Sequence, residues 1–321
     1  MDKNIDDIFN DNFESKIQKD LKIKRKKSNR KLILLAALCT LILFILCNVG
    51  LSFASRKYIF NQFNKDLNTK VIEYQIKYPN EYISNQKYLE TGYFKFQSTL
   101  TISKIIGNKH FLADSLDIPG GLSKMNSLGN SWFISNPFAT LSDNISERPN
   151  TSYSLRELLF MYPYVDYDRC INDFSLLSQI DNSKTVEMAL SFDGEYSYDE
   201  VNKLINSDLI KFYWVDSNTS EENISFNKEK QAYTSDASAI GIKSTFYDGT
   251  TISDTDDRLE KFKDSINYFK ENHNPQINSD IDLDNIKISG IVVTGSPEEL
   301  SSLQDIKIIK HSVLGNVADK F

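Results

Sequence analysis

The hydrophobic and polar positions divide the chain into one apolar run near its N-terminus and a longer region of mixed patterns. Residues 32–54 contain no charged side chain. A helix of this length spans about 35 Å, enough to cross a hydrocarbon core about 30 Å thick. The run also lacks the continuous polar face that a helix of a soluble protein turns to water. We therefore expect residues 32–54 to form one transmembrane helix.

Two other uses of an apolar N-terminal segment fit this run less well. The small residues 52–55 could accept a signal peptidase, but a signal-peptide core spans only about 7–15 residues, and thirty-one residues precede this run. A lipoprotein site is also disfavoured, because Cys39 and Cys47 each follow a leucine rather than a glycine or alanine. An uncleaved membrane anchor is the preferred interpretation.

The distribution of basic residues predicts the orientation of the span. Seven basic residues precede it closely, and they are Lys22, Lys24, Arg25, Lys26, Lys27, Arg30 and Lys31. Only Arg56 and Lys57 follow it closely. Because lysine and arginine concentrate on the cytoplasmic side of a membrane, we expect a cytoplasmic N-terminus and an external C-terminal part. Next to a span, a role in topology and lipid contact is favoured over nucleic-acid binding.

A second hydrophobic pattern lies in residues 1–31, before the span. Its apolar positions recur at four-residue spacing, with one more beside them, and they are Ile5, Ile8, Phe9, Phe13, Ile17 and Leu21. On a helix they form an apolar stripe, with acids early and bases late as the helix dipole favours. So short a helix needs a partner or the membrane surface to bury this stripe. The early acids disfavour an anionic leaflet, so a protein groove that accepts Phe9, Phe13 and Ile17 fits better.

Residues 55–180 combine a helical pattern with strand patterns. Residues 58–78 have helical spacing and continue the membrane helix until Pro79, with apolar positions at Phe60, Phe63, Leu67, Val71 and Tyr74. Residues 92–103 alternate as in a strand, and Gly107–Asn108 is typical of a hairpin turn. Residues 119–150 are rich in Gly, Ser, Asn and Pro and predict a loop, and residues 154–162 predict a short helix. We expect a juxtamembrane helix followed by a mixed, β-rich region.

Residues 181–321 contain two stretches of similar layout, 185–216 and 285–315. Each consists of an alternating strand, a glycine turn, a capped helix and a second strand. Ser197 with Glu200 and Ser296 with Glu299 form capping boxes, the second with Pro297 at the first helical position. Whether the two stretches are a degenerate repeat or convergent patterns stays open at this point.

Two such β-α-β units predict a ferredoxin-like α/β sandwich in the C-terminal third. Between them, residues 256–272 predict an additional helix with one apolar face, formed by Leu259, Phe262, Ile266 and Phe269. The expected fold class is therefore α+β, with one N-terminal transmembrane helix followed by an extracytoplasmic α/β sandwich.

Charge and cysteine content narrow the functions of the external part. After Lys57 the chain carries 38 acidic and 25 basic residues, a net charge of about −13. Such a domain is unsuited to bind nucleic acid or to lie on anionic lipid, and the charge serves solubility. Cys170 is the one cysteine there, so no disulfide forms within this part and its fold depends on its core.

The sequence offers no motif for catalysis. His110, His273 and His311 are not at metal-ligand spacing, and the acidic stretch 280–284 lacks the glycine and the final glutamate of a calcium loop. No phosphate-binding loop or nucleophile elbow is present. We expect no enzyme, cofactor or metal site.

Both ends of the chain resemble a known family. Residues 11–34, followed by a single span, resemble the N-terminal module of the sigma factor regulators of Gram-positive bacteria, which are membrane-anchored anti-sigma factors. Residues 288–321 resemble the end of that family's C-terminal module. The matching positions there are Val292, Val293, Thr294, Gly295, Glu298, Glu299, Leu300, Ser312 and Gly315. Residues 60–180 match only loosely.

The resemblance implies that residues 1–31 hold an extracytoplasmic-function sigma factor away from RNA polymerase through the apolar stripe. It further implies that the external regions, 55–180 and 181–321, respond to envelope stress, with or without a second small membrane protein. The alternative is an envelope-anchored structural or cell-wall-binding protein with no sigma factor partner, and an external hydrolase ranks third.

Overall fold

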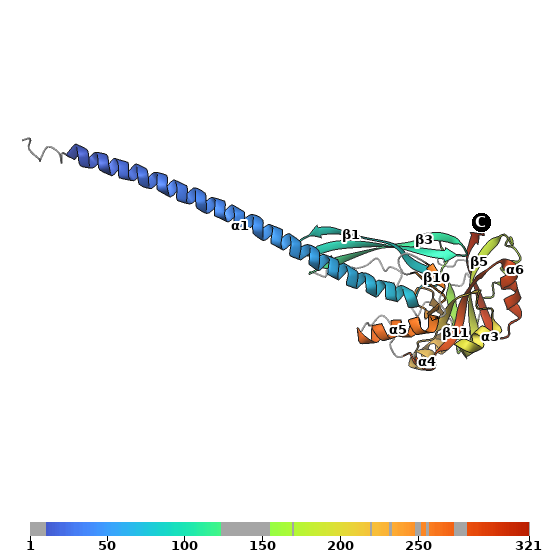
Figure 1. Cartoon of the computed structure of the whole chain (residues 1–321). Coiled ribbons are helices and arrows are strands. Elements are labelled where there is room, and N and C mark those ends of the chain that lie inside the picture. The colour runs from blue at the N-terminus through green and yellow to red at the C-terminus, as the bar shows by residue number, and fades with distance from the viewer. Residues whose placement is uncertain are drawn as a thin grey trace, which may run out of the picture. The chain divides into compact units, whose positions relative to one another are not determined.

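The computed structural model describes residues 11–122, 155–168, 170–218, 220–230, 233–247, 252–254, 257–272 and 281–320 (Figure 1). The chain forms two compact units. The first holds the chain up to Phe60 together with Gly92–Phe94, and the second holds Asn61–Thr91 and Lys95–Phe321.

One long helix, α1, runs from Asp11 to Ile76 and contains the whole apolar run. Its central part is long and apolar enough to cross a membrane, and the side chains of that part are not buried within the protein. This confirms the predicted helix and its end before Pro79. Phe60 departs from the expected stripe, because its side chain is 54% exposed. Ile59 and Phe63, four residues apart, are buried instead, which turns Phe60 away from their face.

Three strands after α1 form a sheet in the order β1-β2-β3. They are β1 (Glu81–Gly92), β2 (Lys95–Ile106) and β3 (Lys109–Gly121). The predicted turn at Gly107–Asn108 is confirmed, with Ile106 opposite Lys109 and Gly107 in the left-handed region at φ +59°. The sequence pattern missed β1, because residues 85–92 are all exposed and do not alternate. Residues 119–121 belong to β3 rather than to the predicted loop, and residues 123–150 of that loop lie outside the described residues.

A five-stranded sheet in the order β12-β5-β11-β6-β8 forms the centre of the second unit. Its strands are β5 (Lys184–Ser197), β6 (Ile210–Val215), β8 (Ile240–Lys243), β11 (Lys287–Gly295) and β12 (Ile309–Asp319). Every pair of neighbours is antiparallel. The helix α3 (Tyr198–Leu204) connects β5 to β6, and α6 (Pro297–Ser301) with the 3-10 turn Ser302–Asp305 connects β11 to β12. The predicted order of strand, capped helix and strand is thus confirmed in both stretches, but Gly194 and Gly295 lie within β5 and β11 rather than in turns.

Both capping boxes are present as predicted. The Ser197 and Ser296 side chains each accept a hydrogen bond from the backbone N–H of the glutamate three residues later, at 3.3 Å. Each glutamate side chain accepts one in return from the backbone N–H of its serine, at 2.8 Å. The two short helices therefore begin at the residues that the sequence indicated.

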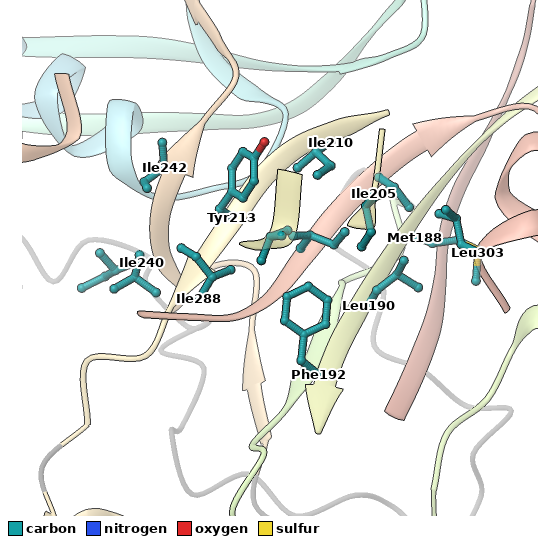
Figure 2. Packing of buried hydrophobic residues seen from close by; sticks show 14 of the residues in the cluster. Met188, Leu190, Phe192, Ile205, Ile210, Tyr213, Ile240, Ile242, Ile288 and Leu303 are labelled. Atoms are coloured by element: carbon teal, nitrogen blue, oxygen red, sulfur yellow. The ribbon is translucent and has the colours of Figure 1, made fainter. Parts of the chain in front are cut away.

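The central sheet is covered on both faces. On one face, alternate residues of β5, namely Val186, Met188, Leu190 and Phe192, join a large apolar cluster (Figure 2). The predicted helix α5 (Arg258–Glu271) packs there through Phe262, Ile266 and Phe269. On the other face, Ala189, Val292 and Val313 meet an aromatic group around Phe160 and Trp214. Burial on both faces explains why eight consecutive residues of β5, 185–192, are buried.

The short helix predicted over residues 154–162 is wrong in its described part, residues 155–162. Leu159–Met161 form a strand, β4, which pairs antiparallel with β7 (Tyr233–Ser235). All three residues of β4 are buried, and the Phe160 ring lies 5.1 Å from that of Trp214. So short an apolar run has no decisive periodicity, and its pairing with a distant strand decides its conformation.

Four short elements complete the described fold. They are α2 (Phe174–Leu177), α4 (Ser220–Glu229), and the paired strands β9 (Thr245–Tyr247) and β10 (Ile252–Asp254).

Replacing Ser296, the N-cap residue of α6, tests how much its capping box stabilises the connection between β11 and β12. We expect Ser296→Ala to lower the free energy of unfolding by about 1 kcal/mol, because the backbone N–H of Glu299 loses its acceptor, the Ser296 hydroxyl. Ser296→Thr should keep most of the stability. Urea unfolding of the full chain in detergent micelles, followed by tryptophan fluorescence, measures both variants. Equal losses for alanine and threonine would contradict a capping role.

Candidate functional site

The predicted sigma-binding stripe is only partly described. Ile5, Ile8 and Phe9 lie outside the described residues, and Phe13 lies in α1 but its side chain is not among those described. Ile17 and Leu21 are four residues apart on α1 and are 45% and 54% exposed. These two apolar side chains therefore share one face of the helix, and the described part of the chain leaves both of them exposed. The seven basic residues between Lys22 and Lys31 are also exposed on α1.

A group of charged side chains inside the second unit was not predicted. We call it the buried charge cluster, and it consists of the buried residues Lys104, Glu187, Asp236 and Lys243 together with Glu81, which is partly exposed. At its centre, the Lys104 ammonium lies 3.3 Å from Glu187 Oε2 and 3.4 Å from Asp236 Oδ2. The Lys104 and Glu187 side chains are 1% and 0% exposed. Lys104 comes from β2 and Glu187 from β5, so the ion pair connects the two sheets.

Two asparagines complete the surroundings of the Glu187 carboxylate. Asn80, just before β1, donates to Oε1 at 2.7 Å, and Asn316 of β12 donates to Oε2 at 2.9 Å. Asn316 is itself fixed by the backbone of Arg156, to which it both donates and accepts a hydrogen bond. The carboxylate therefore has one cation and two amide donors, as a buried charge requires.

Gly315 leaves room for this arrangement. A Cβ at this position would lie 3.1 Å from Glu187 Oε2 and 2.5 Å from the Leu158 side chain. The glycine that carries part of the family resemblance is thus required by close packing beside the buried carboxylate.

Lys243 connects the end of α1 to the edge strand β8 of the central sheet. Its ammonium donates to the backbone carbonyls of Tyr74 and Glu81, at 2.5 Å and 2.6 Å. It also lies 6.0 Å from the centre of the Tyr74 ring, within cation–π range. Alongside, Tyr268 and Ser265 of α5 form hydrogen bonds with Thr69 and Gln75 of α1. The last turns of α1 are therefore held by side chains from residues 240–271.

Burial changes the protonation of several cluster members. It raises the pKa of Glu81 to about 7 and lowers the pKa of Lys243 to about 7. Burial also raises the pKa of Asp236. Burial also disfavours the charged form of Lys104. The nearby Glu187 and Asp236 carboxylates have the larger effect, and they raise the pKa of the Lys104 ammonium above its usual range. Lys104 thus remains the permanent cation of the cluster.

The histidines and cysteines form no catalytic or metal-binding arrangement among the described residues. No group of three His, Cys, Asp or Glu side chains there is placed to hold a metal ion. His110 Nδ1 forms a 2.7 Å hydrogen bond with the Tyr82 hydroxyl, and His273 lies outside the described residues. His311 is buried, which lowers its pKa to about 4, and its ring lies edge-on to that of Tyr167 at 5.3 Å. His311 is therefore a neutral packing residue.

The match with a family model identifies the part of the chain that contains the central sheet. Residues 177–316 match the model of the sigma factor regulator C-terminal domain. This part of the chain is therefore similar to the sigma factor regulators. No curated protein and no solved structure matches the chain significantly. That family is regulatory rather than enzymatic.

The buried charge cluster joins the matched region to the part of the chain that precedes it. Glu187, Asp236 and Lys243 lie inside the match, whereas Glu81 and Lys104 lie before it. Replacing a buried ion pair by apolar residues is often neutral in stability, but removing one partner is costly. The cluster therefore makes the assembly of α1, the three-stranded sheet and the central sheet mutually dependent.

Removing the central cation tests this dependence. We expect Lys104→Met to lower the free energy of unfolding by about 3–5 kcal/mol, because the Glu187 and Asp236 carboxylates lose their partner. Lys184 is a matched control, since its ion pair with Asp319 is exposed to solvent, and Lys184→Met should have a much smaller effect. Urea unfolding of the full chain in micelles measures both. Equal effects would contradict the dependence.

Glu81 makes the stability depend on pH. Its pKa is about 7 in the folded protein against 4.5 ordinarily, so the folded state binds the proton more tightly than the unfolded state. Stability should therefore fall as the pH rises from 4.5 to 7, by up to about 1.4 kcal/mol per pH unit. We expect Glu81→Gln to flatten this part of the curve, measured by urea unfolding at several pH values. Parallel curves for the two proteins would contradict the assignment.

Proposed function

We propose that this chain is a single-pass, membrane-anchored anti-sigma factor whose N-terminal segment binds an extracytoplasmic-function sigma factor. The observation that carries the proposal is the presence, in one chain, of a sigma factor regulator C-terminal domain and a helix long and apolar enough to cross a membrane. A regulator of transcription with such an anchor needs a segment on the cytoplasmic side, where sigma factors act.

The orientation follows from the basic residues around the span. Residues 1–31 are cytoplasmic, residues 32–54 cross the membrane, and residues 55–180 and 181–321 are extracytoplasmic. The support is the excess of seven basic residues before the run over two directly after it.

The apolar stripe of residues 1–31 is the proposed sigma-binding surface. Ile17 and Leu21 support this role, because they are exposed on one face of α1. The sequence extends the same stripe through Phe13, Phe9, Ile8 and Ile5 toward the N-terminus. An amphipathic helix of this kind fits an apolar groove on the partner.

The central sheet has, in our interpretation, a ferredoxin-like arrangement. Its strand order β12-β5-β11-β6 and the helices between β5 and β6 and between β11 and β12 support this view. The edge strand β8 is an addition to the two units.

The external part responds to envelope stress, with or without a second small membrane protein, in a Gram-positive bacterium. The buried charge cluster supports such a response, since it ties the end of α1 to the central sheet through Lys243 and Glu187. A change in the sheet therefore acts on the helix that leads to the cytoplasmic segment.

Recovery of a sigma factor from cells of the native host tests the binding surface. We expect the full-length protein, solubilised in detergent, to retain a sigma factor identifiable by mass spectrometry. The double variant Phe9→Asp and Phe13→Asp should lose it, because each buried carboxylate without a counter-charge costs several kcal/mol.

A matched control adds the same charge at neighbouring polar positions. Ser15→Asp with Gln18→Asp places two carboxylates about 120–180° round an ideal helix from the two phenylalanines and should still retain the partner. If no sigma factor is retained by the unchanged protein, the chain is better explained as an envelope-anchored structural or cell-wall-binding protein.

A further inference from the structure

The turn between β1 and β2 packs against α1 within the first unit. The Tyr93 hydroxyl donates to Asn48 Oδ1 at 3.2 Å, and the Phe94 backbone N–H donates to the Ser55 hydroxyl at 2.7 Å. The Phe94 ring meets the Tyr58 ring edge-on at 5.7 Å. The three helix positions, Asn48, Ser55 and Tyr58, are seven and three residues apart, so they lie on one face of α1.

The position of Asn48 sets the depth of this turn. Asn48 lies six residues before the end of the uncharged run at Ala54, which corresponds to about 9 Å along the helix. A side chain that reaches Asn48 therefore lies beside the apolar run, below the level at which the helix leaves the hydrocarbon. This holds for either orientation of the span, because the turn and the second unit follow the run in the chain.

The structure of the turn also suits a position at the membrane interface. Tyr93 is 49% exposed although its hydroxyl is engaged, so its ring faces outward from the helix. The Asn48 amide donates its own N–H to the Phe44 carbonyl at 2.8 Å and accepts from Tyr93, which lowers the cost of placing it in lipid. Phe94 has φ +55°, a conformation that is strained for a large side chain. The contacts with Ser55 and Tyr58 hold it there.

From these contacts we propose that the Gly92–Phe94 turn is a membrane-interface contact, which places the Tyr93 ring beside the upper acyl chains, just below the lipid headgroups. The occupant of its exposed face is the bilayer itself, because a single span is surrounded by lipid at the level of Asn48. Tyrosine is enriched at this level in membrane proteins, with its ring in the apolar layer and its hydroxyl near polar groups. The proposal rests on the membrane anchor of the proposed function but does not depend on the sigma factor.

Site-directed spin labelling of the full chain tests this contact. Cys39, Cys47 and Cys170 are first replaced by alanine, and the protein is reconstituted in vesicles of phosphatidylcholine and phosphatidylglycerol. One label is placed at Gly92→Cys, where an added Cβ meets open space and Tyr93 is retained, and another at Tyr93→Cys. Accessibility of each label to oxygen and to a water-soluble nickel chelate gives its depth.

Two further labels provide the references. Asn108→Cys lies in the exposed turn at the opposite end of β2, about 37 Å away along twelve residues. Ile42→Cys lies in the middle of the apolar run. We expect the label at Gly92 to be severalfold less accessible to nickel than the label at Asn108 and more accessible to oxygen, as at Ile42.

The outcomes separate failure of this inference from failure of the anchor. Nickel accessibility at Gly92 and Tyr93 equal to that at Asn108 would place the turn in water and overturn the inference. Exclusion of both reagents would also overturn it, since the turn would then be covered by protein. If the label at Ile42 is itself accessible to nickel, the span is wrong and the proposed anchor fails together with this contact.

Discussion

The buried carboxylate of Glu187 is the constraint on which the second unit depends. A charge with 0% exposure is tolerated only when every one of its oxygens has a donor, and here the donors are Lys104, Asn80 and Asn316. They come from β2, from the segment before β1 and from β12, which are far apart in the chain. The carboxylate is therefore satisfied only when all of these elements are in place.

This requirement gives the second unit a single cooperative arrangement. Lys243 adds to it, because its ammonium caps the backbone at Tyr74 and Glu81, where α1 ends and β1 begins. An apolar contact surface would tolerate small displacements, whereas paired buried charges lose much of their interaction when separated. The contacts of Lys243 and Glu187 therefore hold the end of α1 and the start of β1 in one position on the central sheet.

Local signals in the sequence predicted much of the fold. The capping serines 197 and 296, the turn at Gly107 and the uncharged run each depend on residues close together in the chain, and each lies where it was expected. The strand β4 was mistaken for a helix because its conformation depends on β7, more than seventy residues later. The strand β1 was missed because its exposed residues do not alternate.

The buried charge cluster could not be predicted from the sequence. Lys104 and Glu187 are ordinary charged residues in strands that otherwise alternate, and only the fold brings them together. The sequence did contain one indication of the site, which is Glu187 among the apolar residues of β5. A charged side chain at a buried position is almost always paired, so a partner was to be expected. The partner itself lies 83 positions earlier, and no local rule identifies it.

The central claim, that this chain restrains a sigma factor, is tested most directly by transcription in its native host. RNA sequencing compares cells without the protein with cells that express either the full chain or a chain lacking residues 1–21. We expect that loss of the protein raises the transcripts of one set of genes with a shared promoter sequence, and that only the chain with residues 1–21 lowers them again. An unchanged transcript profile, or equal repression by both chains, would contradict it.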